Sequence, residues 1–197
     1  VFQIIIILLA LAAIFWLAEW RRTLEPAMVS LVTVPLVYLC LGYFRLSADW
    51  QYIILAIILV IALTWLIMRI AGGNAVRAFF IMAVITVLAI NIDLFTGSHL
   101  IQSSVLGYDP MAGARYYGVG NEFMGILLGS SIAAAAIAYQ RYSNRVLLIV
   151  ISILFILQCY LIASPSLGAN SDGMLTAPIA FLVTLFLLGD FKLRWKT

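Results

Sequence analysis

Seven long apolar stretches limit the possible folds of this 197-residue chain more than any other feature of its sequence. Each is close to the ~20 residues that a helix needs to cross the hydrocarbon core of a bilayer. Apolar residues are continuous within each stretch and do not alternate with polar ones, which excludes a transmembrane β-barrel. Because backbone groups in lipid have no water to bond, helices remain. The predicted spans are 2–20, 27–44, 51–68, 78–95, 121–140, 146–164 and 174–189.

The composition agrees with lipid as the main solvent of this chain. Hydrophobic residues make up 65% and charged residues only 10%, whereas soluble domains carry about 25% charged residues. We therefore predict an all-α fold, a polytopic transmembrane helix bundle that forms a single domain over residues 1–197. Because the chain begins with Val1 inside an apolar stretch, we expect it to be a fragment of a longer protein.

The basic residues predict the orientation of the bundle. If the seven stretches cross the membrane alternately, nine lysines and arginines fall on one side and two on the other. Loops rich in lysine and arginine stay in the cytoplasm. The N-terminus is therefore predicted outside and the C-terminus in the cytoplasm, in a multi-pass protein of the plasma (inner) membrane. The nine are Arg21, Arg22, Arg69, Arg77, Arg141, Arg145, Lys192, Arg194 and Lys196; the two are Arg45 and Arg115.

This orientation can be tested by cysteine labelling in a variant that lacks Cys40 and Cys159. A cysteine at position 110 should react with a membrane-impermeant maleimide in intact cells, because that loop is predicted outside. A cysteine at position 143 should react only after the cells are opened. Labelling of position 143 from outside, or of position 110 only from inside, would overturn the predicted orientation.

Two connections on the predicted outer side hold most of the residues that could take part in binding or catalysis. They are 93–122 and 165–173, and together they contain the only histidine, four of the five outer acids and seven of the thirteen glycines. Within the first, His99–Leu106 is predicted to form a short interfacial or re-entrant helix. Because both connections lie on one side of the membrane, we expect them to touch.

The residues 113–122, G-A-R-Y-Y-G-V-G-N-E, suggest an anion site. Glycine permits a close approach of backbone to a ligand, and the planar fork of Arg115 suits a phosphate or a carboxylate. A helix beginning at Asn121 and Glu122 adds a dipole that favours an anion. The candidate substrate-binding residues are Arg115, Tyr116, Tyr117, Asn121 and Asn170. The candidate catalytic residues, as acid/base groups or ligands, are Glu122 and Asp172.

Several of these residues also have a structural interpretation. Asn121 is a suitable N-cap for the fifth span, and Asp172 for the seventh. Glu122 suits the first turn of a helix. Arg115 would, in this interpretation, pair with Asp109 or Glu122 and fix the long loop.

A stripe of small residues, Gly125, Gly129 and Ala133, follows in the fifth span. Such a stripe allows two helices to approach closely. We therefore expect this span to be central and to pack tightly through these positions.

Four outer acids, Asp93, Asp109, Glu122 and Asp172, offer oxygen ligands of the kind that magnesium prefers to zinc. No spacing among them requires a metal ion. The sequence therefore predicts neither a metal nor another cofactor.

The segments G-Y-D-P-M-A-G-A-R-Y-Y-G-V-G-N-E-F-M-G (107–125) and L-G-A-N-S-D-G (167–173) carry a resemblance. The chain resembles a poorly characterised family of bacterial polytopic membrane proteins, best represented in Gram-positive lineages. Its members have similar blocks, G-Y-x-P…G-x-R-F/Y-x-G-x-G-N and G-A-N/D-x-G-G. Some members carry an extracytoplasmic alkaline-phosphatase-like domain before the helices, which would fit an outside N-terminus. The likeness covers about 93–190, and Asp172 stands where the family has glycine.

Three functions follow as hypotheses. The first is a bacterial cell-envelope protein whose extracytoplasmic site binds or processes a phosphorylated or lipid-linked substrate. The second is a transporter or flippase with an outer vestibule, and the third is a non-catalytic anchor or assembly subunit. The sequence leaves open whether the protein is an enzyme. Expected partners are membrane lipids, the substrate, and an extracytoplasmic domain or partner chain; no nucleic acid is expected, because the chain has no basic patch interleaved with aromatic residues.

Overall fold

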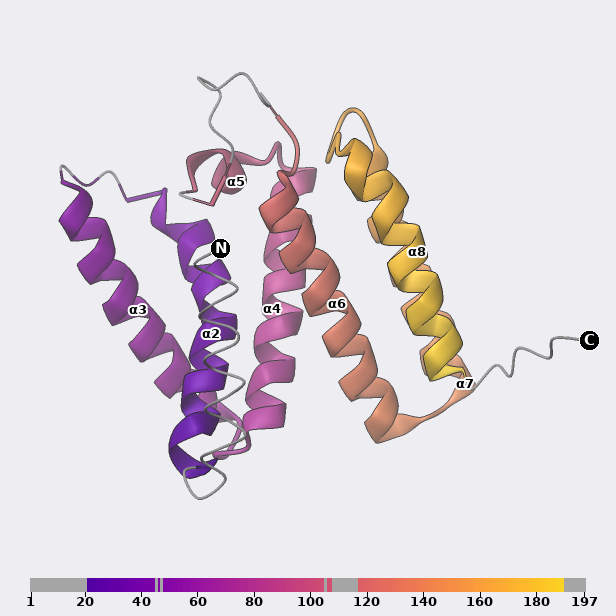
Figure 1. Cartoon of the computed structure of the whole chain (residues 1–197), viewed down its shortest axis with the longest axis horizontal. Helices are drawn as coiled ribbons and strands as arrows, with labels where there is room; N and C mark the ends of the chain where they lie inside the picture. The colour runs from indigo at the N-terminus through magenta and orange to yellow at the C-terminus, as the bar shows by residue number, and fades with distance from the viewer. Residues whose placement is uncertain (1–20, 45, 47, 105, 108–116, 190–197) are drawn as a thin grey trace, which may run out of the picture.

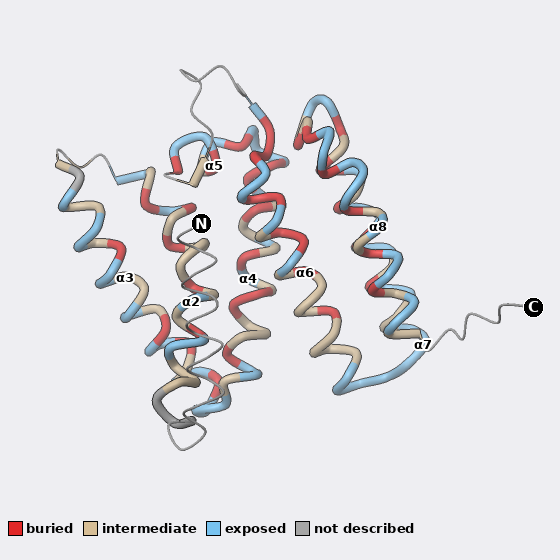
Figure 2. Tube along the Cα trace, in the orientation of Figure 1, coloured by how far each residue is buried: buried red, intermediate tan, exposed pale blue. Residues whose placement is uncertain are grey.

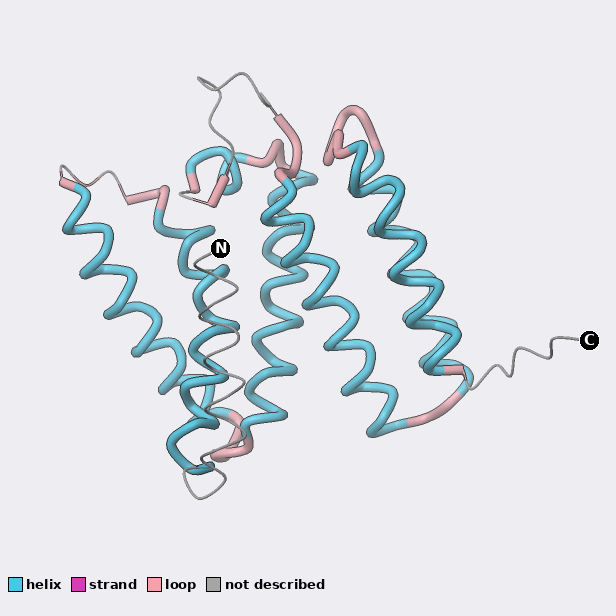
Figure 3. Tube along the Cα trace, viewed as in Figure 1, coloured by secondary structure: helices cyan, strands magenta, loops and turns pink. Residues whose placement is uncertain are grey.

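The computed structural model describes residues 21–44, 46, 48–104, 106–107 and 117–189 (Figure 1). These residues form helices joined by loops and contain no strand (Figure 3). The helices are α2 (Arg21–Leu41), α3 (Asp49–Ile70), α4 (Ala75–Phe95), α5 (His99–Ser103), α6 (Asn121–Tyr142), α7 (Arg145–Ala163) and α8 (Ser171–Leu188).

Six of these helices, all except α5, are long and apolar enough to cross a membrane. The all-α, multi-pass membrane protein predicted from the sequence is thereby confirmed at this level. Each of the last six predicted stretches overlaps one of the six helices. The first predicted stretch, 2–20, lies outside the described residues, so seven spans and the outward N-terminus stay predictions.

Glycine and asparagine set the boundaries of the helices at the tight turns. Between α3 and α4, Gly72 and Gly73 adopt φ angles of +65° and +77°, a left-handed conformation that glycine reaches without steric cost. Asn74 then caps α4, because its side chain accepts a hydrogen bond from the backbone N–H of Arg77. Asn144 caps α7 in the same way through the N–H of Leu147.

The helices are arranged around a central pair, α4 and α6 (Figure 1). Helices α2 and α3 pack on one flank of this pair, and α7 and α8 pack against each other on the other flank. On the second flank, the rings of Phe155 of α7 and Phe181 of α8 stack with centroids 4.0 Å apart. The central pair buries Ile90, Leu94, Phe123 and Leu127 in the largest core cluster.

Many of the residues exposed on the outside of the bundle are large and apolar. Figure 2 shows exposed positions along all the long helices. Helix α3, for example, exposes Ile53, Ile57 and Ile61, each by more than half of its surface. In water such a surface would be an aggregation hazard, but in a bilayer it is the expected face toward lipid. The burial pattern therefore supports the reading of the six long helices as membrane spans.

The predicted packing role of the small-residue stripe is wrong for its two glycines. Gly125 and Gly129 are exposed, and a Cβ atom added to either would meet nothing within 4 Å beyond its chain neighbours and the nearby backbone of its own helix. Helix α6 is nevertheless central, as expected. It packs on its neighbours through the larger residues Phe123, Leu127 and Leu128, which lie on a different face.

A short helix forms within the predicted segment, and a buried acid holds it in place. Both carboxylate oxygens of Asp93, at the end of α4, accept hydrogen bonds of 2.9 Å from the backbone N–H groups of Leu100 and Ile101 in α5. The Ser104 hydroxyl donates to the carbonyl of Tyr38 in α2, at 2.8 Å. Helix α5 thus lies across the ends of α2 and α4. We call this end of the bundle the α5 end.

Candidate functional site

Two glycine-containing loops meet at the α5 end, immediately before α6 and before α8. The backbone N–H of Val119 donates to the carbonyl of Gly168 at 2.8 Å. Gly118 beside it has a φ of +85°, and a Cβ atom at this position would overlap the Gly168 carbonyl. Both the backbone conformation and the close approach therefore require glycine at position 118. The predicted contact between the two connections is confirmed.

The second loop is fixed to the end of α7 by its own backbone. The N–H groups of Gly168 and Asn170 donate to the carbonyls of Leu161 and Ile162, at 2.9 and 3.0 Å. Those carbonyls belong to the last turn of α7, which has no further helical N–H groups to bond. Because these carbonyls accept hydrogen bonds from the loop, the loop folds back over the end of α7. The loop is therefore a rigid support for the residues that follow.

Asn170 links the two loops to α8. Its side chain is 1% exposed. Its Oδ1 accepts from the N–H of Gly173 at 2.6 Å and so caps α8, while its Nδ2 donates to the Val119 carbonyl at 2.9 Å and to the Oδ1 of Asn121 at 3.0 Å. An asparagine side chain has two N–H donors, and both are used here.

Asn121 continues this network to a carboxylate. Its Nδ2 donates to the Oδ2 of Asp172 at 3.2 Å, which joins the first turns of α6 and α8. Asn121 and Asp172 are both exposed. The chain of contacts thus runs from a buried amide, Asn170, through Asn121 to a solvent-accessible acid.

A second carboxylate, Glu122, lies next to this network in the first turn of α6. It is exposed, and within the described residues its carboxylate has neither a hydrogen-bond partner nor an ion-pair partner. The positive end of each helix dipole favours a negative charge in the first turn, so Glu122 and Asp172 both occupy favourable positions. Tyr117, in the loop before α6, is 53% exposed.

The structure thus brings Asn121, Asn170 and Asp172 into one hydrogen-bonded network. Glu122 is next to Asn121 in the chain, and Tyr117 lies in the loop before α6. Arg115 and Tyr116 lie outside the described residues, so the predicted anion contact is not part of this geometry.

Two capping assignments made from the sequence are wrong. The residue that precedes α6 in the N-cap position is Gly120, and Asn121 is the first residue of the helix. Helix α8 is capped by Asn170 and not by Asp172, which lies in its first turn. The sequence does contain a signal for the cap of α8, because asparagine is a preferred N-cap and Asn170 stands three residues before Gly173, whose N–H it accepts from. The predicted first-turn position of Glu122 is confirmed.

The acids considered as metal ligands do not gather within the described part of the chain. No group of three or more His, Cys, Asp or Glu side chains lies close enough there to hold a metal ion. Asp93 instead uses both oxygens to hold α5. Asp109 lies outside the described residues.

Comparisons of this chain with protein-family models, with curated proteins and with solved structures give no significant match. Arguments about its function therefore depend on the geometry of the site.

We expect Asn170→Ala to lower the free energy of unfolding by about 2–4 kcal/mol, because it removes three hydrogen bonds and leaves the buried Val119 carbonyl unpaired. Matched controls are Asn74→Ala and Asn144→Ala, two exposed N-caps that should cost about 1 kcal/mol each. The first loses one hydrogen bond to the backbone, and the second loses two, of which one is long at 3.3 Å. Thermal unfolding of the detergent-solubilised protein measures the difference. Equal losses in all three variants would show that the Asn170 network adds nothing beyond helix capping.

Proposed function

We propose that this chain is a bacterial cell-envelope membrane protein whose extracytoplasmic α5 end binds or processes a phosphorylated or lipid-linked substrate. One observation carries the proposal: the Asn170 network fixes the first turns of α6 and α8 against each other, and these turns present the exposed carboxylates of Glu122 and Asp172. Two acids on a rigid support can serve as acid/base groups or as ligands for a polar head group.

The contacts of the described residues suggest a division of roles. Asn170 has no free donor, since both N–H groups of its amide are used within the protein. We therefore assign it to positioning rather than to substrate contact, which revises its predicted role. Glu122 and Asp172 are available to a substrate, and Asn121 holds one oxygen of Asp172. Arg115, with Tyr116 and Tyr117, would bind the anion.

The surface beside the carboxylates suits a lipid-linked substrate. Met174 and Leu175, in the first turns of α8, are 58% and 68% exposed. A substrate with a polar head and an apolar tail would place the head at Asp172 and let the tail run along these side chains. A soluble phosphorylated substrate would use only the polar part of this surface.

The other hypotheses receive less support from the described residues. A transporter needs polar groups that continue through the membrane, but Thr33 and Thr64 bond each other at 3.2 Å and Gln158 is buried on another helix. An anchor would have the charges of its loops satisfied by one another, and Arg115, the predicted partner of Glu122, lies outside the described residues.

Farnesyl phosphate tests the anion and lipid requirements together. We expect it to raise the melting temperature of the wild-type protein in neutral detergent, because it combines a phosphate with a polyprenyl chain. Arg115→Gln should weaken this binding at least tenfold, since the planar fork that would hold the phosphate is lost. The matched control is Arg45→Gln, which removes the other arginine predicted on the same side.

Farnesol and inorganic phosphate separate the two parts of the substrate. Stabilisation by farnesol alone would indicate unspecific insertion and contradict the proposal. Stabilisation by inorganic phosphate alone would favour a soluble phosphorylated substrate. Equal effects of the substitutions at positions 45 and 115 would remove the assigned role of Arg115.

The carboxylates are tested by Glu122→Gln and Asp172→Asn. Both are exposed and keep an oxygen acceptor, so each variant should stay within about 1 kcal/mol of the wild-type stability, which includes the loss of a favourable first-turn charge. We expect both to fail to complement a strain that lacks the gene, because an amide cannot act as a base at this position. Folded variants that complement fully would instead favour the anchor hypothesis.

A further inference from the structure

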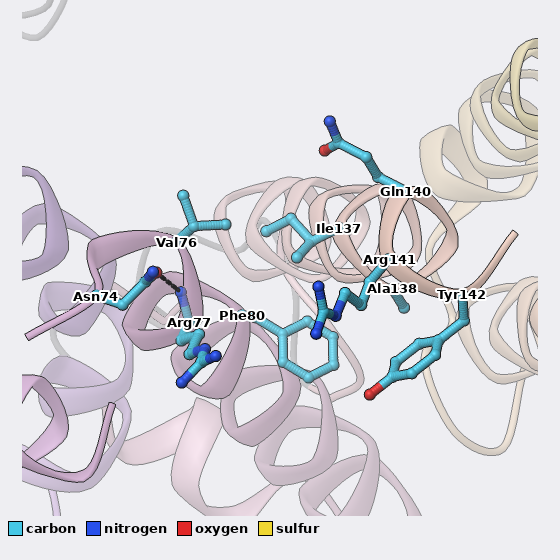
Figure 4. Close-up of a pocket in the computed structure, with 9 residues that line it drawn as sticks. All are labelled: Asn74, Val76, Arg77, Phe80, Ile137, Ala138, Gln140, Arg141 and Tyr142. Carbon is cyan, nitrogen blue, oxygen red and sulfur yellow. Dashed lines mark hydrogen bonds between the residues drawn. The ribbon is translucent and has the colours of Figure 1, made fainter. Parts of the chain in front are cut away.

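A second site lies at the end of the bundle opposite the α5 end, between the first residues of α4 and the last residues of α6 (Figure 4). The pocket there has a volume of about 490 Å³, within the usual range for pockets that take small ligands. Helix α4 contributes Arg77 and Phe80, preceded by its cap Asn74, and α6 contributes Ile137, Arg141 and Tyr142.

The charge of this pocket has one sign. Two arginines and no acid line it, and both arginines are exposed. Within the described residues, neither guanidinium takes part in a hydrogen bond or an ion pair. Arg69, near the same end of the bundle, does have a partner within the protein, since its guanidinium lies 5.1 Å from the ring centre of Trp65.

The pocket combines this charge with an apolar wall. Phe80 and Ile137 are half-buried. Each lies about one turn farther from the end of its helix than the arginine on the same helix. In the view of Figure 4 the ring of Phe80 lies next to the guanidinium group of Arg141, and the guanidinium group of Arg77 lies on the α4 side of the ring. A ligand bound here would therefore meet cations at the helix ends and apolar surface farther into the bundle.

The position of the arginines along their helices sets the depth of the site. Arg77 is the third residue of α4, and Arg141 is the last but one of α6. Helices of 21 and 22 residues are about 32 Å long, slightly more than the ~30 Å of hydrocarbon in a bilayer. Residues at their ends lie at the level of the lipid head groups. The first turn of α4 brings the positive end of a helix dipole and the last turn of α6 brings the negative end of another, so the attraction for an anion comes from the two arginines.

We propose that this pocket binds the head group of an anionic membrane phospholipid, with Arg77 and Arg141 on its phosphate. The occupant is a lipid, such as phosphatidylglycerol, because the apolar wall begins where the acyl chains would start. Basic pockets between membrane helices on the cytoplasmic side commonly bind anionic head groups, and the distribution of lysine and arginine predicts that this end is cytoplasmic. The site is separate from the one proposed at the α5 end.

The test titrates the full chain, in neutral detergent, with dioctanoyl phosphatidylglycerol and with dioctanoyl phosphatidylcholine. We expect phosphatidylglycerol to bind more tightly and to raise the melting temperature more. The variant Arg77→Gln/Arg141→Gln should weaken its binding at least tenfold and remove the preference. Because both side chains are exposed and unpaired among the described residues, the lipid-free variant should melt like the wild type.

Arg145→Gln is the matched control, because Arg145 is exposed, follows soon after Arg141 and does not line the pocket. It should leave phosphatidylglycerol binding unchanged. An equal loss with this control would reduce the effect to general surface charge and overturn the proposal. Equal binding of the two lipids by the wild type, or stabilisation by inorganic phosphate that matches that by the lipid, would also overturn it. If the double variant fails to fold, equal binding of the two lipids by the wild type still overturns the proposal.

Discussion

The need to pair every backbone N–H and C=O group inside hydrocarbon governs the whole of this structure. It makes the spans helical, and it also shapes the polar end of the bundle, where the helices stop. The last carbonyls of α7 receive the N–H groups of the loop that follows, so this loop folds back onto its helix. Asn170 is thereby placed where its amide reaches the loop before α6. The candidate site thus derives from the way in which one helix ends.

Support and reactivity are assigned to different side chains in the candidate site. Asn170 is buried and fully hydrogen-bonded, whereas Glu122 and Asp172 are exposed at the helix starts. Asn121 stands between them and touches both Asn170 and Asp172. Such an arrangement allows the exposed acids to change without loss of the fold. It also makes the buried amide the residue of the site with the greatest expected effect on stability.

The positions of the helices could be predicted from the sequence because length and hydropathy decide them. The predicted stretch 51–68, for instance, became Asp49–Ile70, and 121–140 became Asn121–Tyr142. The contact between the two loops followed from their predicted place on one side of the membrane. Seven spans and the role of Arg115 concern residues outside those that the structure describes.

The faces of the helices could not be predicted in the same way. In a soluble helix the apolar stripe marks the buried face, but a membrane helix is apolar on every side. Gly125 and Gly129 therefore looked like a packing surface and are exposed instead. The caps were predicted wrongly for a related reason. The side chains of Asn121, Asn170 and Asp172 can all cap a helix, and only the backbone geometry selects Asn170.

The link between Val119 and Asn170 has a consequence for the order of events during synthesis. Its two partners are separated by the whole of α6 and α7, and Asn170 is the N-cap immediately before α8. Helices that emerge first can insert and pair while the ribosome is still translating. The two loops, however, can join only after the turn between α7 and α8 has been made. A nascent chain stopped before that turn would hold the helices up to α7 but leave the candidate site open, so the contact between the loops forms later than those helices.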